Sequence, residues 1–252
     1  MKKALITGAS SGIGAEIAKQ LDRHGYSVIL SARRKDRLEA LANELKNPAD
    51  IITADLSIKS ECIRLYEETR KQKISVLINN AGFGLIGDFD STDLDRELSM
   101  LELNCAAVHI LTKLFLKDML KRDKGFILNV GSSAGLMPGG PLMSSYYASK
   151  AYVVSLTQSI AGELRAKGSH VGISVLCPGP VDTEFNDVAG CSFSVKAISA
   201  EYCAKKALNG LFNRKTIIVP GLGVKLSTIV SKMAPNKIVV DTVRTIQNKK
   251  IK

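Results

Sequence analysis

The stretch that decides the fold is Lys3-Ala-Leu-Ile-Thr-Gly-Ala-Ser-Ser-Gly-Ile-Gly14, near the start of the sequence. Its apolar beginning predicts a buried strand, and the helical apolar spacing after Gly12 predicts a helix. The glycines let the backbone turn tightly, so that its N–H groups and the positive end of the helix can approach an anion. The spacing is G-x-x-x-G-x-G, and a glycine turn can also serve backbone geometry alone. The residues expected to hold phosphate are Gly8, Ser10, Ser11, Gly12, Ile13 and Gly14.

Short apolar stretches rich in β-branched residues alternate, along most of the chain, with segments whose apolar residues recur at helical spacing. The expected strands are Lys3–Thr7, Ser27–Ala32, Asp50–Ala54, Ser75–Asn79, Gly125–Val130, Gly172–Leu176 and Thr216–Val219. The expected helices are Gly12–His24, Lys35–Leu45, Lys59–Lys71, Leu94–Lys121, Tyr146–Lys167 and Ala200–Phe212. Strands separated by helices predict right-handed βαβ units. We therefore expect an α/β fold, with one Rossmann-type, doubly wound parallel sheet of about seven strands and helices on both faces. Residues 1–252 are expected to form a single domain.

The segment 221–252 differs from the rest and is expected to form a short helical C-terminal extension. Its apolar residues suggest two amphipathic helices, packed over the carboxyl edge of the sheet or against a partner. Lys225, Lys232 and Lys237 flank these apolar positions, so a membrane surface is a second interpretation. A lid or a subunit contact is the more common use of such helices, and we expect membrane association to be unlikely.

Composition narrows the class of protein. Lys plus Arg number 35 and Asp plus Glu number 24, so the net charge is 35 − 24 = +11. The basic residues are scattered and accompany no nucleic-acid-binding motif, so no nucleic-acid partner is expected. The five cysteines form no CxxC pair, which favours reduced thiols in the cytoplasm and predicts no metal site. The sequence contains no run of about 18 apolar residues, so we expect no membrane-spanning helix.

The end of the second expected strand indicates which anion the site would take. A dinucleotide site that prefers NAD offers Asp or Glu to the ribose 2′-hydroxyl at this point. The sequence here is Ala32-Arg33-Arg34, and guanidinium groups bind a phosphate with paired, charge-assisted hydrogen bonds. Arg33 and Arg34 could also be ordinary surface charges. We expect NADP(H) to be preferred over NAD(H), because cations are disfavoured at a helix start unless they have another use.

Tyr146 and Lys150 are four residues apart at the start of an expected helix, so their side chains lie on one face. A free phenol has a pKa near 10, which is too high for acid–base work at neutral pH. A nearby ammonium group favours the phenolate and lowers that pKa. The Y-x-x-x-K spacing is common on helices, so it becomes specific only in combination with other motifs.

With these motifs in order, the chain resembles the classical short-chain dehydrogenase/reductase family over roughly Met1 to Gly221. The motifs that carry the resemblance are Thr7-Gly8-x-x-x-Gly12-Ile13-Gly14, Asp55-Leu56, Asn79-Asn80-Ala81-Gly82, Asn104, Gly131-Ser132-Ser133-Ala134-Gly135, Tyr146-x-Ala148-Ser149-Lys150 and Pro178-Gly179-Pro180-Val181-x-Thr183. The resemblance implies hydride transfer between NADP(H) and a carbonyl or secondary alcohol, with Tyr146 as general acid or base. A 3-oxoacyl carrier-protein-type reductase and a dinucleotide-binding sensor without turnover are the alternatives.

The resemblance also implies individual roles. Lys150 would lower the pKa of Tyr146 and bind the nicotinamide ribose, Ser132 would bind the substrate oxygen, and Asn104 would hold a water that relays protons to Lys150. The remaining cofactor-binding residues implied are Asp55, Leu56, Asn80, Ala81, Gly82, Pro178, Gly179, Val181 and Thr183. Ser133 is the competing serine, since it lies 13 positions before Tyr146, the commoner spacing in the family, and Ser132 lies 14 before it. Ser132 is preferred because Ser-x-Ala-Gly matches from it.

Two expectations concern the surroundings of the site. Segment 184–198 carries several aromatic and apolar residues among small and polar ones, which suggests a lid over an apolar carbonyl or alcohol substrate. The helices 94–121 and 146–167 carry more apolar residues than one sheet face needs, so we expect a homodimer or homotetramer. The residues concerned are Leu98, Leu101, Leu111, Leu114, Phe115, Val153, Leu156 and Ile160.

Overall fold

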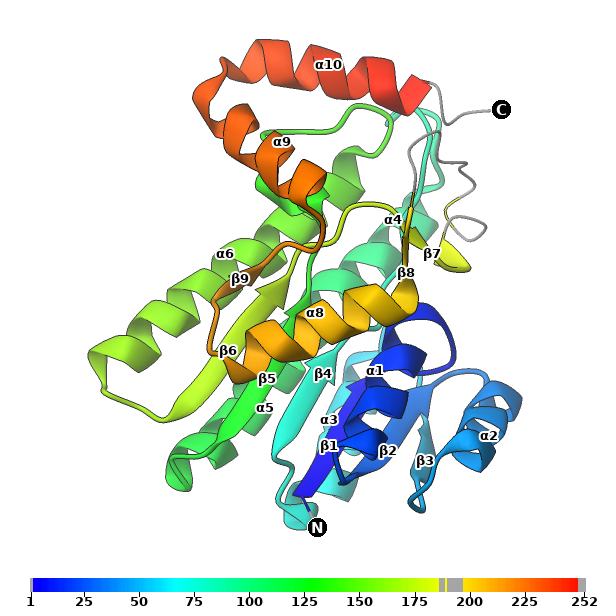
Figure 1. The fold of residues 1–252 in the computed structure, drawn as a ribbon. Helices are drawn as coiled ribbons and strands as arrows, with labels where there is room; N and C mark the ends of the chain where they lie inside the picture. The colour runs from blue at the N-terminus through cyan, green and yellow to red at the C-terminus, as the bar shows by residue number, and fades with distance from the viewer. Residues whose placement is uncertain (1, 186–188, 190–196, 249–252) are drawn as a thin grey trace.

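All seven strands of the central sheet run parallel, in the order β3-β2-β1-β4-β5-β6-β9. The structure is a computed structural model, and it describes residues 2–185, 189 and 197–248 (Figure 1). The strands are β1 (Lys2–Thr7), β2 (Tyr26–Ala32), β3 (Asp50–Thr53), β4 (Val76–Asn79), β5 (Gly125–Val130), β6 (Val171–Leu176) and β9 (Ile217–Ile218). The predicted doubly wound α/β fold is confirmed, and no end of these strands differs from the expected one by more than one residue.

Helices cover both faces of the sheet because alternate strand residues point to opposite sides. Ile6 lies in the cluster formed with α1, α2 and α8, and its neighbour Leu5 lies in the cluster formed with α3, α5 and α6. Both residues are fully buried. The helices are α1 (Gly12–Arg23), α2 (Lys35–Glu44), α3 (Lys59–Thr69), α4 (Leu94–Leu101), α5 (Val108–Lys121), α6 (Ser144–Ala166), α8 (Ala200–Phe212), α9 (Leu222–Met233) and α10 (Asn236–Asn248).

The chain reverses its direction of travel across the sheet between β1 and β4. From β1 it moves outward through β2 to β3, and it then returns to build β4, β5, β6 and β9 on the other side. The loops that follow β1 and β4 therefore diverge, which opens a crevice at the carboxyl edge of the sheet.

The predicted helix over 94–121 is one continuous helical segment, in which α4 and α5 are joined by a π-helical turn at Glu102–Ala107. Asp93 caps its start by accepting a hydrogen bond from the backbone N–H of Arg96 (2.8 Å). By length and composition this helix could also cross a membrane, although no membrane span was predicted from the sequence. The core helices of soluble proteins pass the same test, and α5 packs here against β4 and β5.

The other expectations have mixed outcomes. Leu111, Phe115 and Val153 are buried in the core, so they were wrongly assigned to a subunit contact. Leu94 and Leu98 are exposed on α4, and the homo-oligomer stays a prediction.

Most of the expected lid, 184–198, lies outside the described residues, and its far end pairs as β8 (Ile198–Ser199) with β7 (Val181–Asp182). The cysteines in the described part of the chain are free thiols.

Candidate functional site

A cavity of about 420 Å³ lies at the carboxyl edge of the sheet, between the turn after β1 and the start of α6. Every predicted site residue lines it except Gly14 and Asn104. The lining residues that were predicted are Gly8, Ser10, Ser11, Gly12, Ile13, Arg33, Arg34, Asp55, Leu56, Asn80, Ala81, Gly82, Ser132, Tyr146, Lys150, Pro178, Gly179, Val181 and Thr183. The fold thus brings motifs from along most of the chain to one continuous site.

The turn after β1 has the properties of a phosphate cradle. Gly8 and Gly12 have φ values of +62° and +55°, which residues with a Cβ rarely adopt. Ser11 precedes α1 without a side-chain hydrogen bond to the helix, and the first turn of α1 holds no acidic residue. Gly12 and Ile13 at this helix start line the cavity, so their N–H groups are available to an anion without an acidic residue in the same turn. Gly14 serves packing, since a Cβ there would lie 2.4 Å from the carbonyl oxygen of Gly8.

The end of β1 is tied to the end of β4 by side-chain hydrogen bonds. The Thr7 hydroxyl accepts from the backbone N–H groups of Asn80 (3.0 Å) and Ala81 (3.1 Å). The Asn80 amide donates in return to the carbonyl oxygens of Thr7 and Gly8. Asn80 and Ala81 therefore hold the glycine turn in shape as well as lining the cavity.

The two arginines after β2 differ in their surroundings. Arg33 is 73% exposed in its side chain and, among the described residues, forms a 3.8 Å ion pair with Asp55. Arg34 donates to the hydroxyls of Ser10 (3.1 Å) and Ser11 (3.2 Å) and to the carboxylate of Glu184 (2.9 Å). Arg37 also contacts Glu184, at 3.3 Å. The hydrogen bond from Arg34 is the main cause that lowers the pKa of Glu184, so the carboxylate is ionised at neutral pH.

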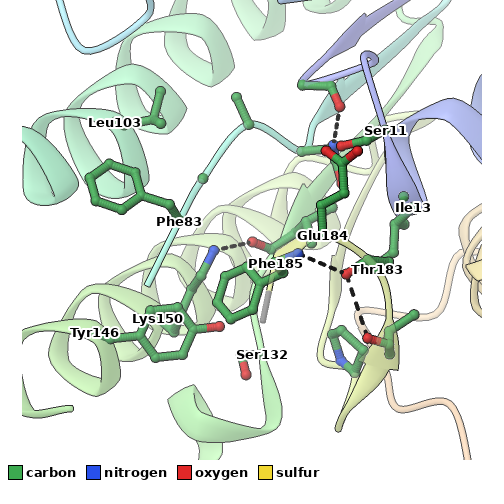
Figure 2. A pocket seen from close by; sticks show the side chains of 18 of the residues that line it. Ser11, Ile13, Phe83, Leu103, Ser132, Tyr146, Lys150, Thr183, Glu184 and Phe185 are labelled. Atoms are coloured by element: carbon green, nitrogen blue, oxygen red, sulfur yellow. Dashed lines mark hydrogen bonds between the residues drawn. The ribbon is translucent and has the colours of Figure 1, made fainter. Parts of the chain in front are cut away.

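Tyr146 and Lys150 occupy the opposite end of the cavity, one turn apart on α6 (Figure 2). Both are buried, and the ammonium nitrogen of Lys150 lies 5.8 Å from the centre of the Tyr146 ring. The Lys150 ammonium donates to the carbonyl oxygen of Val130 (3.0 Å). Burial lowers the pKa of Lys150 from 10.5 to about 8, and the nearby Cys105 and Cys177 raise it by less. At pH 7 the ammonium therefore remains charged beside the phenol.

Asn104 does not line the cavity but supports it from behind. It lies in the π-helical turn, and such turns occur often at functional sites. Its amide donates to the carbonyl of Phe83 (2.9 Å) and to the hydroxyl of Ser149 (3.1 Å), and its oxygen accepts from the N–H of Phe83 (3.1 Å). A Cβ on Gly82 would lie 2.7 Å from this oxygen and 3.4 Å from the Lys150 nitrogen, so only glycine fits between the two groups.

Both candidate serines line the cavity. Ser132 lies toward the hydroxyl end of Tyr146 in Figure 2, and its oxygen accepts a hydrogen bond from the N–H of Ala134 (3.1 Å). Ser133 donates its backbone N–H to the carbonyl of Pro178 (2.8 Å), which anchors the loop after β5 to the loop after β6. Tyr147 also lines the cavity, and its hydroxyl accepts a hydrogen bond from the amide of Gln247 (2.9 Å).

Apolar residues line the cavity near Tyr146; Phe185 lies in the expected lid segment 184–198, whereas Phe83 and Leu103 were not predicted from the sequence. Phe83, Leu103, Met143 and Phe185 add an apolar surface around Tyr146, and the Phe185 ring lies 5.6 Å from the Tyr146 ring. Phe83 directly follows the predicted motif Asn80-Ala81-Gly82, so its position in the sequence could have indicated it. Gln247 reaches the cavity from α10, and no motif in the sequence indicates that contact.

Replacing Lys150 with Met should stabilise the protein. A fall in the pKa from 10.5 to about 8 corresponds to a cost of about 3 kcal/mol for keeping the charged form folded at pH 7. The folded pKa of this base is depressed, so the parent gains stability as pH rises from about 8 to 10.5. The lost hydrogen bond to Val130 reduces the gain.

Urea unfolding at several pH values measures this effect. Lys150→Met should be more stable than the parent at pH 7, and the difference in the free energy of unfolding should shrink toward pH 10. A variant less stable than the parent at pH 7 would show that the buried ammonium does not destabilise the fold.

Comparison with known proteins agrees with this geometry. A profile of the short chain dehydrogenase family matches residues 2–190. The 3-oxoacyl-[acyl-carrier-protein] reductase of Rickettsia prowazekii is 33% identical over 189 residues, covering 74% of this chain and 75% of that protein. A short-chain dehydrogenase from Sphingobium yanoikuyae in complex with NADPH has a TM-score of 0.83 at 29% identity, with 92% and 94% of the two chains covered.

A Burkholderia phymatum short chain dehydrogenase/reductase in complex with NAD has a TM-score of 0.85 at 24% identity, and the likeness covers 92% of this chain and 93% of that one. At that identity the likeness shows the shared fold alone. The family match and the shared fold together support a nicotinamide dinucleotide cofactor. This chain belongs to the short-chain dehydrogenase family of oxidoreductases.

Proposed function

We propose that the protein transfers a hydride between NADP(H) and a ketone or secondary alcohol with an apolar body. The observation that carries the proposal is the continuous cavity that joins the glycine turn after β1 to Tyr146 and Lys150. The nicotinamide, when bound, supplies the hydride in reduction and accepts it in oxidation. A sensor without turnover would have little use for a buried lysine beside the tyrosine.

The side chains around Tyr146 handle the proton. In reduction the Tyr146 hydroxyl gives its proton to the carbonyl oxygen, and in oxidation the phenolate takes it back. The Lys150 ammonium favours the phenolate and so lowers the pKa of Tyr146. The Ser132 hydroxyl donates to the substrate oxygen where negative charge develops. Asn104 would hold a water next to Lys150 that returns protons from solvent.

Tyr146→Phe should reduce turnover by about 100-fold or more, because it removes the general acid. The NADPH dissociation constant, measured by fluorescence, should change little. Tyr147→Phe is the matched control, since Tyr147 bonds Gln247 and its turnover should stay near that of the parent. Equal losses in the two variants would rule out the assignment of the acid to Tyr146.

Ser132→Ala should lower kcat by about 10-fold or more, because one donor to the developing oxyanion is lost. Ser133→Ala should have a much smaller effect, since the contact of Ser133 with Pro178 uses its backbone. Steady-state kinetics of both variants separates the two serines. The reverse order would shift the assignment by one residue.

The cofactor preference rests on Arg33, Arg34 and Glu184. Arg33 is exposed and weakly paired, so its guanidinium can turn to a 2′-phosphate at the end of β2. Arg34 is engaged by Ser10, Ser11 and Glu184, so a phosphate that reaches Arg34 competes with a carboxylate. Arg37 is a second ion-pair partner of Glu184. Glu184 therefore keeps one partner when Arg34 turns to the phosphate, which lowers the free-energy cost of that change. We expect Arg33 to contribute more than Arg34.

The parent enzyme should use NADPH with a kcat/KM tens-fold above that for NADH, because a charge-assisted bond to phosphate contributes about 1.5–3 kcal/mol. Ala32→Asp with Arg33→Ser should invert this preference. Glu184→Gln should raise the affinity for NADPH several-fold and leave NADH unchanged, since it removes a competing negative charge. Asp182→Asn is the control, since it neutralises an exposed carboxylate two residues away. Equal kcat/KM for both cofactors in the parent would overturn the assignment.

Reduction of 3-oxoacyl thioesters is the second candidate, supported by the relative from Rickettsia prowazekii that carries that activity in its name. The apolar lining from Phe83, Leu103, Met143 and Phe185 suits an acyl chain as well as a compact ketone. NADPH oxidation should be followed against a panel of free ketones and against 3-oxoacyl thioesters of coenzyme A and carrier protein. A kcat/KM at least about tenfold higher for the thioesters would select the second candidate, and no turnover with any substrate would favour the sensor.

A further inference from the structure

Helix α9 (Leu222–Met233) has its polar side turned inward and its apolar side turned outward. Its buried residues are Thr228 and Ser231, whose hydroxyls bond to carbonyl oxygens of the same helix. Its exposed apolar residues repeat at helical spacing, and we call them the α9 face. They are Leu222 (87% exposed), Leu226 (63%), Ile229 (48%), Val230 (54%) and Met233 (83%). Water-exposed helices in soluble proteins have the opposite arrangement.

The orientation of α9 is held by the packing of Val224, on the side of the helix away from the α9 face. Val224 fills the space beside Gly179. A Cβ added to Gly179 would lie 2.6 Å from a methyl carbon of Val224. Val239 and Val243 of α10 are buried, whereas Ile238 and Ile246 of the same helix are exposed. Figure 1 shows α9 and α10 together at the end of the molecule where the strands have their carboxyl ends. Rotating α9 to bury its face would expose Val224.

The charges in the two helices of the C-terminal extension are mostly positive. Residues 222–248 contain Lys225, Lys232, Lys237 and Arg244 against the single acid Asp241, a net charge of 4 − 1 = +3, and α9 itself has no acidic residue. The sequence continues with Lys249, Lys250 and Lys252. A second copy of this chain would place the same basic surface against itself. A bilayer with anionic headgroups matches both the apolar face and the lysines.

We propose that the α9 face binds the surface of an anionic lipid bilayer, with α9 lying in the plane of the headgroups. The sequence alone favours a lid or a subunit contact for this segment, whereas the exposure of the α9 face together with the charge around it favours the membrane surface. The inference is independent of the proposed reaction, since no residue of the α9 face lines the cavity.

Vesicle co-sedimentation of the full chain tests the proposal. The protein should pellet with vesicles of phosphatidylcholine mixed with phosphatidylglycerol and much less with phosphatidylcholine alone. Leu226→Glu with Val230→Glu should reduce binding by about tenfold or more, since it removes apolar contact and adds repulsion. Lys225→Ser with Lys232→Ser should also lower binding to the anionic vesicles about tenfold. Ile63→Glu, at an exposed apolar position of α3, is the matched control and should bind as the parent does.

Circular dichroism and the NADPH dissociation constant should be the same in all variants, so that lost binding reflects the α9 face and not unfolding. Light scattering gives the mass of the parent and of Leu226→Glu with Val230→Glu. A lower mass for that variant would identify the α9 face as a contact between copies and overturn the proposal. Binding that is absent, or equal on neutral and anionic vesicles, or unchanged by both double variants, would overturn it as well.

Discussion

The site depends on one constraint, the parallel pairing of β1 with both β2 and β4. Parallel strands end at the same edge of a sheet, and the reversal of strand order at β1 makes the loops that follow β1 and β4 part there. The gap between these loops stays defined because Thr7 and Asn80 bond each other's backbone. Gly8 can then adopt its positive φ and leave the helix start of α1 open to an anion.

At the other end of the cavity, Lys150 is positively charged although burial disfavours the charged form. Lys150 has a buried ammonium group whose pKa falls to about 8, and the hydrogen bond to Val130 offsets part of the cost. Gly82 leaves room for that nitrogen and for the Asn104 amide behind it. In the proposed mechanism this charge lowers the pKa of Tyr146, so stability and proton transfer would make opposite demands on this position.

The C-terminal extension connects the cavity to the outside of the molecule. Gln247 of α10 bonds Tyr147 at the cavity wall, and Val224 of α9 packs against Gly179 in the loop after β6. A bilayer beneath the α9 face would therefore lie against the same extension that lines the cavity.

Local patterns in the sequence were enough for the alternating strands and helices, the glycine turn, and the pairing of Tyr146 with Lys150, because each depends on spacing within one element and its neighbours. They were not enough for contacts between distant segments. Glu184 reaches Arg34 only because the loops after β6 and β2 meet at the sheet edge. The outward turn of the apolar residues of α9 was also decided by tertiary packing, since periodicity identifies an apolar side and not the surroundings that side will face.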